Sequence, residues 1–304
     1  MHKPDSRLAL FIHPVKFYVM NKMYHVFSVG ENVLFRENGD YIFFNNKFAS
    51  STFMYQLQVL AETTMSTHFH SIVESADEKA VDDSILKLRK AYSLYYSSKY
   101  GFSIGDSFKV SKIEVSGRES VLNELRYVMK NQVHHYVVTY PLAYPYSSVS
   151  YIFMDQLMPP VFIEALNART SKFCELNYRQ KRHIAGVDKV PDNWMVLDNN
   201  MILPSSYINT TRVRVFWGNN VKSFMFDINK NQTDARKEII MADNLDIRVA
   251  GYTDIEVCRI IDDFSAQCSR KSFHFLETDE RKLMIRNLKQ KTVNEEQIKR
   301  CLWL

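Results

Sequence analysis

The sequence predicts an α+β fold built on an antiparallel sheet, and three observations support this prediction. Four short segments alternate apolar and polar residues, as strands do when one face of a sheet is buried. Three longer segments repeat their apolar residues at the spacing of an amphipathic helix. Their order along the chain is β-α-β-β-α-β-α, which is typical of a split β-α-β, ferredoxin-like sheet with helices on one face.

Each element is expected from its local pattern. Residues 23–30 alternate and end in glycine, and the other strands are expected over residues 56–65, 68–74 and 107–115. The helices are expected over residues 41–55, 77–100 and 118–133. Pro141 and Pro145 then end this part of the chain, because proline interrupts regular structure.

The chain is long enough for one domain and a second region. We expect a lead-in over residues 1–22, a domain over 23–155, and a mixed, partly helical C-terminal region over 156–304. Within the last region, we expect a β-hairpin that pairs residues 211–217 with 221–228 and a helix over 253–267. Residues 278–304 are expected to form a helical pair that packs on the body of the protein rather than reading DNA.

Composition narrows the class of protein. Hydrophobic residues make up 46% and charged residues 24%, as in ordinary globular proteins, and the net charge of +5 permits a polyanionic partner without requiring one. The four cysteines include no CxxC pair, so no structural zinc site is expected. No signal peptide and no membrane span are predicted, so we expect a reduced, cytoplasmic protein that does not bind membranes.

The segment His68-Phe69-His70 is the first candidate site. In a strand, residues i and i+2 share a face and lie about 7 Å apart, so both imidazoles can reach one metal ion while Phe69 faces the helices. Two imidazole ligands would leave positions open for substrate oxygens. The alternative is a chance pair among nine histidines, and the spacing by itself favours that alternative.

The helix over 118–133 carries the second candidate. Its apolar stripe consists of Leu122, Leu125, Met129 and Val133. Tyr127 and Asn131 lie together on nearly the opposite face, where the phenol can approach a site on the sheet. A tyrosine oxygen can attack a backbone phosphate, but its ordinary pKa of about 10 means that it needs help from a cation. The alternative is an exposed tyrosine without a role, one of 17 in the chain.

Several motifs follow one another in a recognisable order. They are Tyr24-His25-Val26, Leu34-Phe35, Asp40-Tyr41, the run from Met65 to Val73, the run from Tyr127 to Val133, and Tyr144-Pro145-Tyr146-Ser147-Ser148. In order and spacing they resemble the single-tyrosine HUH transposases, especially the REP-associated branch. The resemblance covers about residues 23–150, less than half of the chain.

The resemblance implies a complete site. His68, His70 and Asn131 would bind a divalent metal ion, Mg²⁺ or Mn²⁺, and Tyr127 would form a 5′-phosphotyrosine link with single-stranded DNA, often beside a hairpin. Two positions depart from the family pattern. Thr67 stands where the family has asparagine, and Gln132, which stands in place of proline, becomes a possible rival metal ligand.

Two segments, residues 87–100 and 178–183, combine basic side chains with aromatic rings, as single-strand binding surfaces do. The candidate DNA-binding residues are Lys87, Arg89, Lys90, Tyr96, Arg179, Lys181 and Arg182. The alternative for the first segment is a solvated helix face whose tyrosines lie in the core.

Three functions therefore remain open at this point. The leading one is a metal-dependent DNA strand transferase of the HUH type that acts as a monomer or a homodimer. The second is a transposase-derived regulator that binds DNA hairpins without cutting them. The third is an unrelated ferredoxin-like protein that binds RNA or has a structural role.

Overall fold

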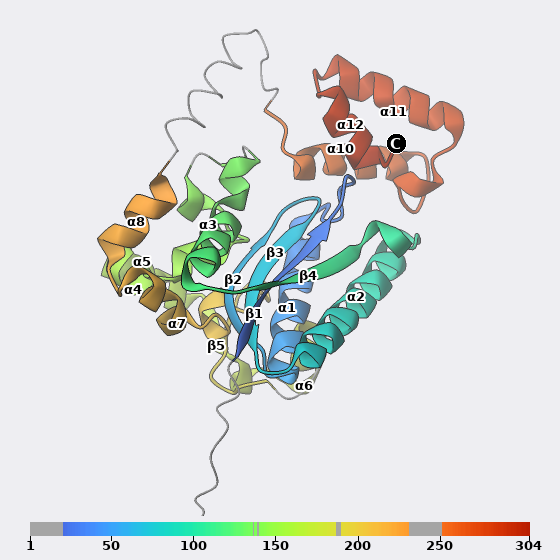
Figure 1. The fold of residues 1–304 in the computed structure, drawn as a ribbon. Coiled ribbons are helices and arrows are strands. Elements are labelled where there is room, and N and C mark those ends of the chain that lie inside the picture. The colour runs from blue at the N-terminus through green and yellow to red at the C-terminus, as the bar shows by residue number, and fades with distance from the viewer. Residues whose placement is uncertain (1–20, 136, 139, 187–189, 231–250) are drawn as a thin grey trace, which may run out of the picture.

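The structure is a computed structural model that describes residues 21–135, 137–138, 140–186, 190–230 and 251–304 (Figure 1). Almost all of the expected lead-in, residues 1–22, lies outside the described residues. Across the described residues, no helix combines the length and the apolar character needed to cross a bilayer.

A four-stranded antiparallel sheet forms the centre of the protein. Its strands are β1 (Lys22–Val29), β2 (Gln58–Thr64), β3 (Phe69–Ser75) and β4 (Lys109–Val115). They lie in the order β2-β3-β1-β4, and each neighbouring pair is antiparallel. The α+β class and the predicted strand and helix order are therefore confirmed.

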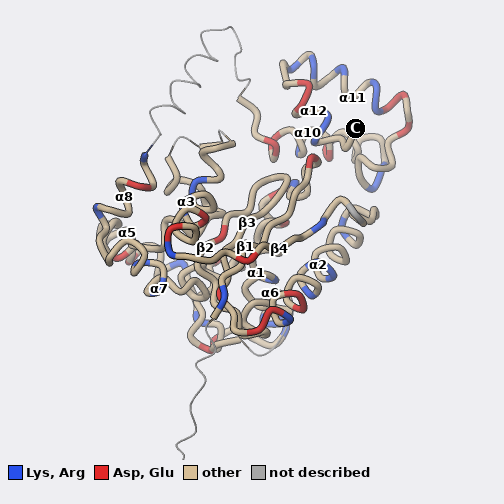
Figure 2. Tube along the Cα trace, in the orientation of Figure 1, with Lys and Arg blue, Asp and Glu red and all other residues tan. Residues whose placement is uncertain are grey.

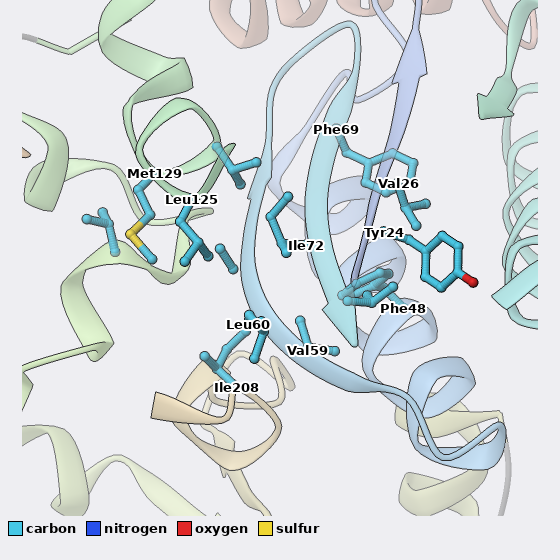
Figure 3. Close-up of a cluster of buried hydrophobic side chains, with 14 of the residues drawn as sticks. Tyr24, Val26, Phe48, Val59, Leu60, Phe69, Ile72, Leu125, Met129 and Ile208 are labelled. Carbon is cyan, nitrogen blue, oxygen red and sulfur yellow. The ribbon is translucent and has the colours of Figure 1, made fainter. Parts of the chain in front are cut away.

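The helices α1 (Asn38–Met54) and α2 (Glu78–Tyr100) cover one face of the sheet, and α3 (Arg118–His134) covers the other (Figure 1). The expectation that all helices share one face is therefore wrong for α3. Alternation along β3 explains the division, because Phe69 points to one side and Ile72 to the other (Figure 3). Phe69 packs against Phe44 of α1, with ring centroids 4.8 Å apart. On the opposite side, the apolar stripe of α3 meets β2 and β3.

The C-terminal region is mostly helical. Its elements are α4 (Met154–Leu157), α5 (Pro160–Ala168), β5 (Thr170–Lys172), α6 (Tyr178–Ala185), β6 (Met195–Leu197), α7 (Thr210–Arg214), α8 (Val221–Asn229), α10 (Asp254–Gln267), α11 (Thr278–Gln290) and α12 (Glu295–Leu302). The expected helix at 253–267 and the expected helical pair at 278–304 are confirmed by α10, α11 and α12.

The β-hairpin expected over 211–217 and 221–228 is wrong, because both segments are helical. Side-chain caps explain the outcome. The Asn220 side chain accepts hydrogen bonds from the backbone N–H groups of Lys222 and Ser223, which starts α8. The apolar residues Phe224 and Ile228, four apart, then bury one helical face.

The main apolar core draws on both sides of the predicted boundary at residue 155. Ile208, Val213 and Trp217 join the same buried cluster as the strands of the sheet. The helices α10, α11 and α12 form a second cluster of their own, which also includes Val33. We call these three helices with their connections, residues 251–304, the C-terminal unit.

The buried carboxyl group of Glu62 predicts a pH-dependent stability. Glu62 lies on β2 and is 3% exposed, and the Tyr207 hydroxyl donates to it. Burial raises the pKa of Glu62 to about 8, so the folded protein keeps a proton that the unfolded chain releases near its ordinary pKa of 4.5. The stability linked to this proton is fully present below about pH 4.5 and is lost as the pH rises toward 8, at no more than about 1.4 kcal/mol per pH unit.

We therefore expect Glu62→Gln to flatten the fall in unfolding free energy between acidic and mildly alkaline pH, as measured by urea unfolding. The matched control is Glu119→Gln on an exposed side chain, which should leave the slope unchanged. An unaltered slope in the Glu62 variant would show that another group carries the pH dependence.

Candidate active site

A cavity of about 560 Å³ lies between the sheet and α3. Strand β1, the segment that leads into β3, and α3 all contribute to its wall. Its lining residues are His25, Phe27, Ser28, Val29, Gly30, Thr67, His68, His70, Ile113, Glu124, Tyr127 and His135. Three residues that the sequence singled out, His68, His70 and Tyr127, therefore line one cavity.

The two histidines enter this cavity from β3 and the turn before it. Their ring centroids lie 5.1 Å apart. The His68 Nε2 atom lies 3.1 Å from the Oδ1 atom of Asn131, so the turn before β3 meets α3 at this point. Gly30 faces the same turn, and a Cβ atom added there would lie 2.5 Å from the carbonyl oxygen of Thr67. Only a residue without a side chain fits this close approach.

Tyr127 lies on the wall formed by α3. Its ring centroid is 5.1 Å from that of His70, and its side chain is 40% exposed. The apolar stripe of α3 explains this position, because Leu125 and Met129 are buried on the side of α3 that faces the sheet (Figure 3). Tyr127 lies off this stripe and lines the cavity. A phenol in this place is open to a ligand that enters the cavity.

Sequence reasoning missed His25 and Glu124, which complete the wall. The His25 Nε2 atom lies 2.9 Å from the Nδ1 atom of His70, and the His25 Nδ1 atom lies 2.8 Å from a carboxylate oxygen of Glu124. Glu124 precedes Tyr127 by three residues, which places both on one side of the helix. The three-residue spacing from Tyr127 could therefore have identified Glu124 as a candidate from the sequence. The contact of His25 depends on the register of β1 against β3, in which Phe27 pairs with His70.

Two further histidines, to which the sequence assigned no role, lie at the end of α3. The ring of His134 stacks on Tyr127 with centroids 6.0 Å apart. The ring of His135 lies 4.9 Å from that of His68. Among the described residues, three imidazole rings thus lie within 6.0 Å of the Tyr127 ring, those of His25, His70 and His134. His68 adjoins His70, and His135 adjoins His68.

Burial keeps the central imidazoles neutral at pH 7. Burial lowers the pKa of His68 to about 4 and that of His70 to about 3, with a smaller contribution from the neighbouring imidazoles. Burial also lowers the pKa of His25, although Glu124 opposes that effect. A neutral imidazole keeps a lone pair, and this is the form that binds metal ions.

The residues around His68 fit a divalent ion in part. Two imidazoles and the amide oxygen of Asn131 form a mixed nitrogen and oxygen donor set, which suits Mn²⁺ better than Mg²⁺. The Asn131 side chain is fully buried, and its Nδ2 atom has no hydrogen-bond partner. In the part of the chain that the structure describes, no group of three or more His, Cys, Asp or Glu side chains is arranged to hold a metal. An ion would therefore depend on the Asn131 amide and on water.

Gln132, the possible rival ligand, is held by its amide nitrogen. It is fully buried, and its Nε2 atom donates to the carbonyl oxygens of Met129 and Pro141. Like Asn131, it does not line the cavity. Its Oε1 atom is buried and has no hydrogen-bond partner among the described residues, so its role as a rival ligand stays a prediction.

The basic residues predicted to bind DNA lie elsewhere. Lys87, Arg89 and Lys90 are on α2, and Arg179, Lys181 and Arg182 are on α6, which packs against α1 (Figure 2). Both helices are on the face of the sheet opposite to α3. Lys87 and Lys90 line a second cavity of about 410 Å³, which Gly186 at the end of α6 also lines. The two basic segments therefore meet each other but do not meet Tyr127.

Tyr96 is a correction to the predicted DNA-binding set. Its side chain is fully buried, and its ring lies against Tyr100 and Trp303 with centroids 4.5 and 5.8 Å away. No face of the ring is open to a nucleobase, so the prediction of stacking is wrong for this residue. Tyr96 therefore belongs to the core, as the alternative interpretation of this segment predicted.

Comparisons with known proteins give few matches. No protein-family model and no curated protein matches the chain. The fold has some similarity to the solved structure of a REP-associated tyrosine transposase bound to a REP hairpin. The two share 12% sequence identity with a TM-score of 0.38, over 47% of this chain and 86% of that one.

Proposed function

We propose that this protein is a metal-dependent enzyme that cuts and rejoins single-stranded DNA through Tyr127. The observation that carries this proposal is that the Tyr127 phenol lines the same cavity as His68 and His70, although the three residues come from separate elements. The resemblance of the sequence motifs to single-tyrosine HUH transposases supports the same chemistry. The substrate would be a DNA strand beside a hairpin.

The proposed reaction is a phosphoryl transfer. The Tyr127 oxygen forms a bond to the scissile phosphorus, the bond from phosphorus to the 3′ oxygen breaks, and a 5′-phosphotyrosine link results. The phenol proton must leave, and the 3′ oxygen must gain a proton. The imidazole of His134, whose ring stacks on Tyr127, can accept the phenol proton and then deliver a proton to the 3′ oxygen. Rejoining reverses these steps with the 3′ hydroxyl of another strand end.

Three residues would hold the metal ion: His68, His70 and Asn131. A bound Mg²⁺ or Mn²⁺ would polarise the phosphate and offset the charge that builds up on it. The chain's own contribution is to supply neutral imidazoles, an amide oxygen beside His68, and a phenol close to His70.

The proposal predicts that His68→Ala lowers cutting by on the order of 10²-fold or more, since a group that stabilises the developing charge is lost. The assay is Mn²⁺-dependent nicking of a single-stranded oligonucleotide that contains a hairpin, together with its binding affinity. Hairpin binding should remain within a few-fold. His183→Ala, on an exposed residue of α6, is the matched control and should cut normally. Cutting by the His68 variant at the normal rate would refute the proposal.

A second candidate is a hairpin-binding regulator that has lost the cutting activity. A specific observation favours it, because the described residues contain no metal-holding group made only of His, Cys, Asp and Glu. The departures at Thr67 and Gln132 agree with such a loss. This candidate predicts tight hairpin binding, no cutting at any Mn²⁺ concentration, and no effect of His68→Ala on either measurement.

A further inference from the structure

We infer that His25 and Glu124 are positioning residues that hold His70 by its Nδ1 atom and leave Nε2 as its ligand nitrogen. The inference rests on the proposed function, in which His70 binds the metal ion. It concerns a hydrogen-bonded chain of three side chains from β1, β3 and α3, which passes from Glu124 through His25 to His70.

The direction of these hydrogen bonds follows from the carboxylate of Glu124, which is the first of the three linked side chains. A carboxylate can only accept hydrogen bonds, so the Nδ1 atom of His25, 2.8 Å from Glu124, carries a proton. A His25 ring with its single proton on Nδ1 offers its Nε2 atom as an acceptor. The Nδ1 atom of His70, 2.9 Å away, must then be the donor. A neutral His70 that is protonated on Nδ1 keeps its lone pair on Nε2.

His68 is also held at Nδ1, by a different partner, but its proton lies on the other nitrogen. The Asn131 amide oxygen can only accept, so the Nε2 atom of His68, 3.1 Å away, donates to it, and Nδ1 accepts from the Thr67 hydroxyl at 2.8 Å. In both histidines, therefore, Nδ1 is engaged by the protein. In His70, Nε2 is the nitrogen that remains available to bind a metal ion. In His68, Nε2 lies beside Asn131, the proposed third metal ligand.

The residues around these three linked side chains restrict the movement of His70. The ring of Phe27 stacks on His70 at a centroid distance of 6.0 Å and an interplanar angle of 19°, so it limits rotation of that imidazole. His70 itself is 7% exposed, which leaves little water to replace His25 as a partner. Partners of this kind fix the orientation of a ligating imidazole, and their loss typically weakens metal binding by about 10- to 100-fold.

The test uses the full chain and two readouts. Long-range ¹H–¹⁵N spectra of the metal-free protein report which nitrogen of His70 carries the proton, and titration with Mn²⁺ alone reports affinity. The unaltered protein should show His70 protonated on Nδ1. His25→Phe should produce a mixture of the two His70 tautomers, leave the His68 signals in place, and weaken Mn²⁺ binding by about 10- to 100-fold.

A second pair of variants guards against a folding defect at His25, because Glu124 is partly exposed and can be changed without opening the core. Glu124→Leu should shift the His70 tautomer and weaken Mn²⁺ binding. Glu124→Gln keeps an acceptor oxygen and should therefore keep most of the Nδ1-protonated His70 and most of the Mn²⁺ affinity. His183→Phe is the control for loss of a histidine and should change neither.

The inference is overturned if His70 in the unaltered protein is protonated on Nε2, or if both His25→Phe and Glu124→Leu leave the His70 tautomer and the Mn²⁺ affinity unchanged. The tautomer measurement needs neither DNA nor metal. Failure of the unaltered protein to cut DNA, with the expected tautomer and normal Mn²⁺ binding, therefore counts against the proposed function and supports the positioning of His70.

Discussion

Replacement of Tyr127 by phenylalanine should abolish DNA cutting while the protein keeps its fold and its affinity for DNA. The change removes a single oxygen atom from a side chain that is 40% exposed, so the packing of α3 against the sheet is untouched. If this oxygen is the nucleophile, the other hydroxyl groups of the cavity are poor substitutes, because both are already engaged. The Thr67 hydroxyl contacts His68 at 2.8 Å, and the Ser28 hydroxyl accepts a hydrogen bond from the backbone N–H of Phe69. Loss of a nucleophile lowers a rate by on the order of 10³-fold or more.

The measurement is a denaturing gel with a hairpin-containing oligonucleotide labelled at its 3′ end, because a 5′-phosphotyrosine link retains that end on the protein. The unaltered protein should give a labelled protein band, and Tyr127→Phe should give none. Tyr178→Phe is a suitable control, since Tyr178 is 65% exposed and lies on α6. A labelled protein band that persists in the Tyr127 variant would assign the nucleophile to another residue.

Local sequence patterns predicted the central sheet and its helices well. They failed where contacts between residues distant in sequence determine the structure. The strands of the sheet and the helices α2 and α3 carry a recognisable period, and α1 could be predicted from its run of apolar residues, so the order of these elements could be predicted. The segments 211–217 and 221–228 alternate over only a few residues, and such short runs do not separate strand from helix. The capping side chain of Asn220 and the burial of Phe224 on α8 decided the outcome.

The residues of the candidate site also differ in whether local sequence patterns could predict them. The pair His68 and His70 could be predicted from i, i+2 spacing, and Tyr127 from its place on an amphipathic helix. The contact of His25 with His70 could not, because it depends on how β1 and β3 align. Tyr96 was wrongly predicted to face DNA, since Trp303, near the end of the chain, covers it. No local pattern indicates contact between residues so distant in sequence.

The largest expected loss of stability comes from Arg36, which joins the segment between β1 and α1 to the C-terminal unit. Its side chain is fully buried. One guanidinium nitrogen donates to the carbonyl oxygen of Cys301 at 2.9 Å, and another to the Asp262 carboxylate at 2.7 Å. The group also lies over the ring of Phe273, 4.0 Å from its centroid. All three partners belong to the C-terminal unit.

We expect Arg36→Met to lower the free energy of unfolding by about 3 kcal/mol, the lower end of the range for breaking a buried ion pair. Methionine keeps the apolar stem but leaves the carbonyl of Cys301 without its donor and Asp262 without its cation. The lower end applies because the Asp262 side chain is 38% exposed, so water can solvate the carboxylate that remains. Urea unfolding measures the loss. Arg270→Met, at a partly exposed pair with Glu280, should cost much less.

The same variant should weaken Mn²⁺ binding, although Arg36 does not line the cavity. The backbone N–H groups of Leu34 and Phe35, next to Arg36, donate to the carbonyl oxygen of Ser66, two residues before His68. The Ser66 hydroxyl in turn donates to Asp254 of the C-terminal unit at 2.6 Å. When the unit loosens, the turn that carries His68 loses support from both sides. A Mn²⁺ affinity that stays unchanged while stability falls would show that the turn holds its shape without the C-terminal unit.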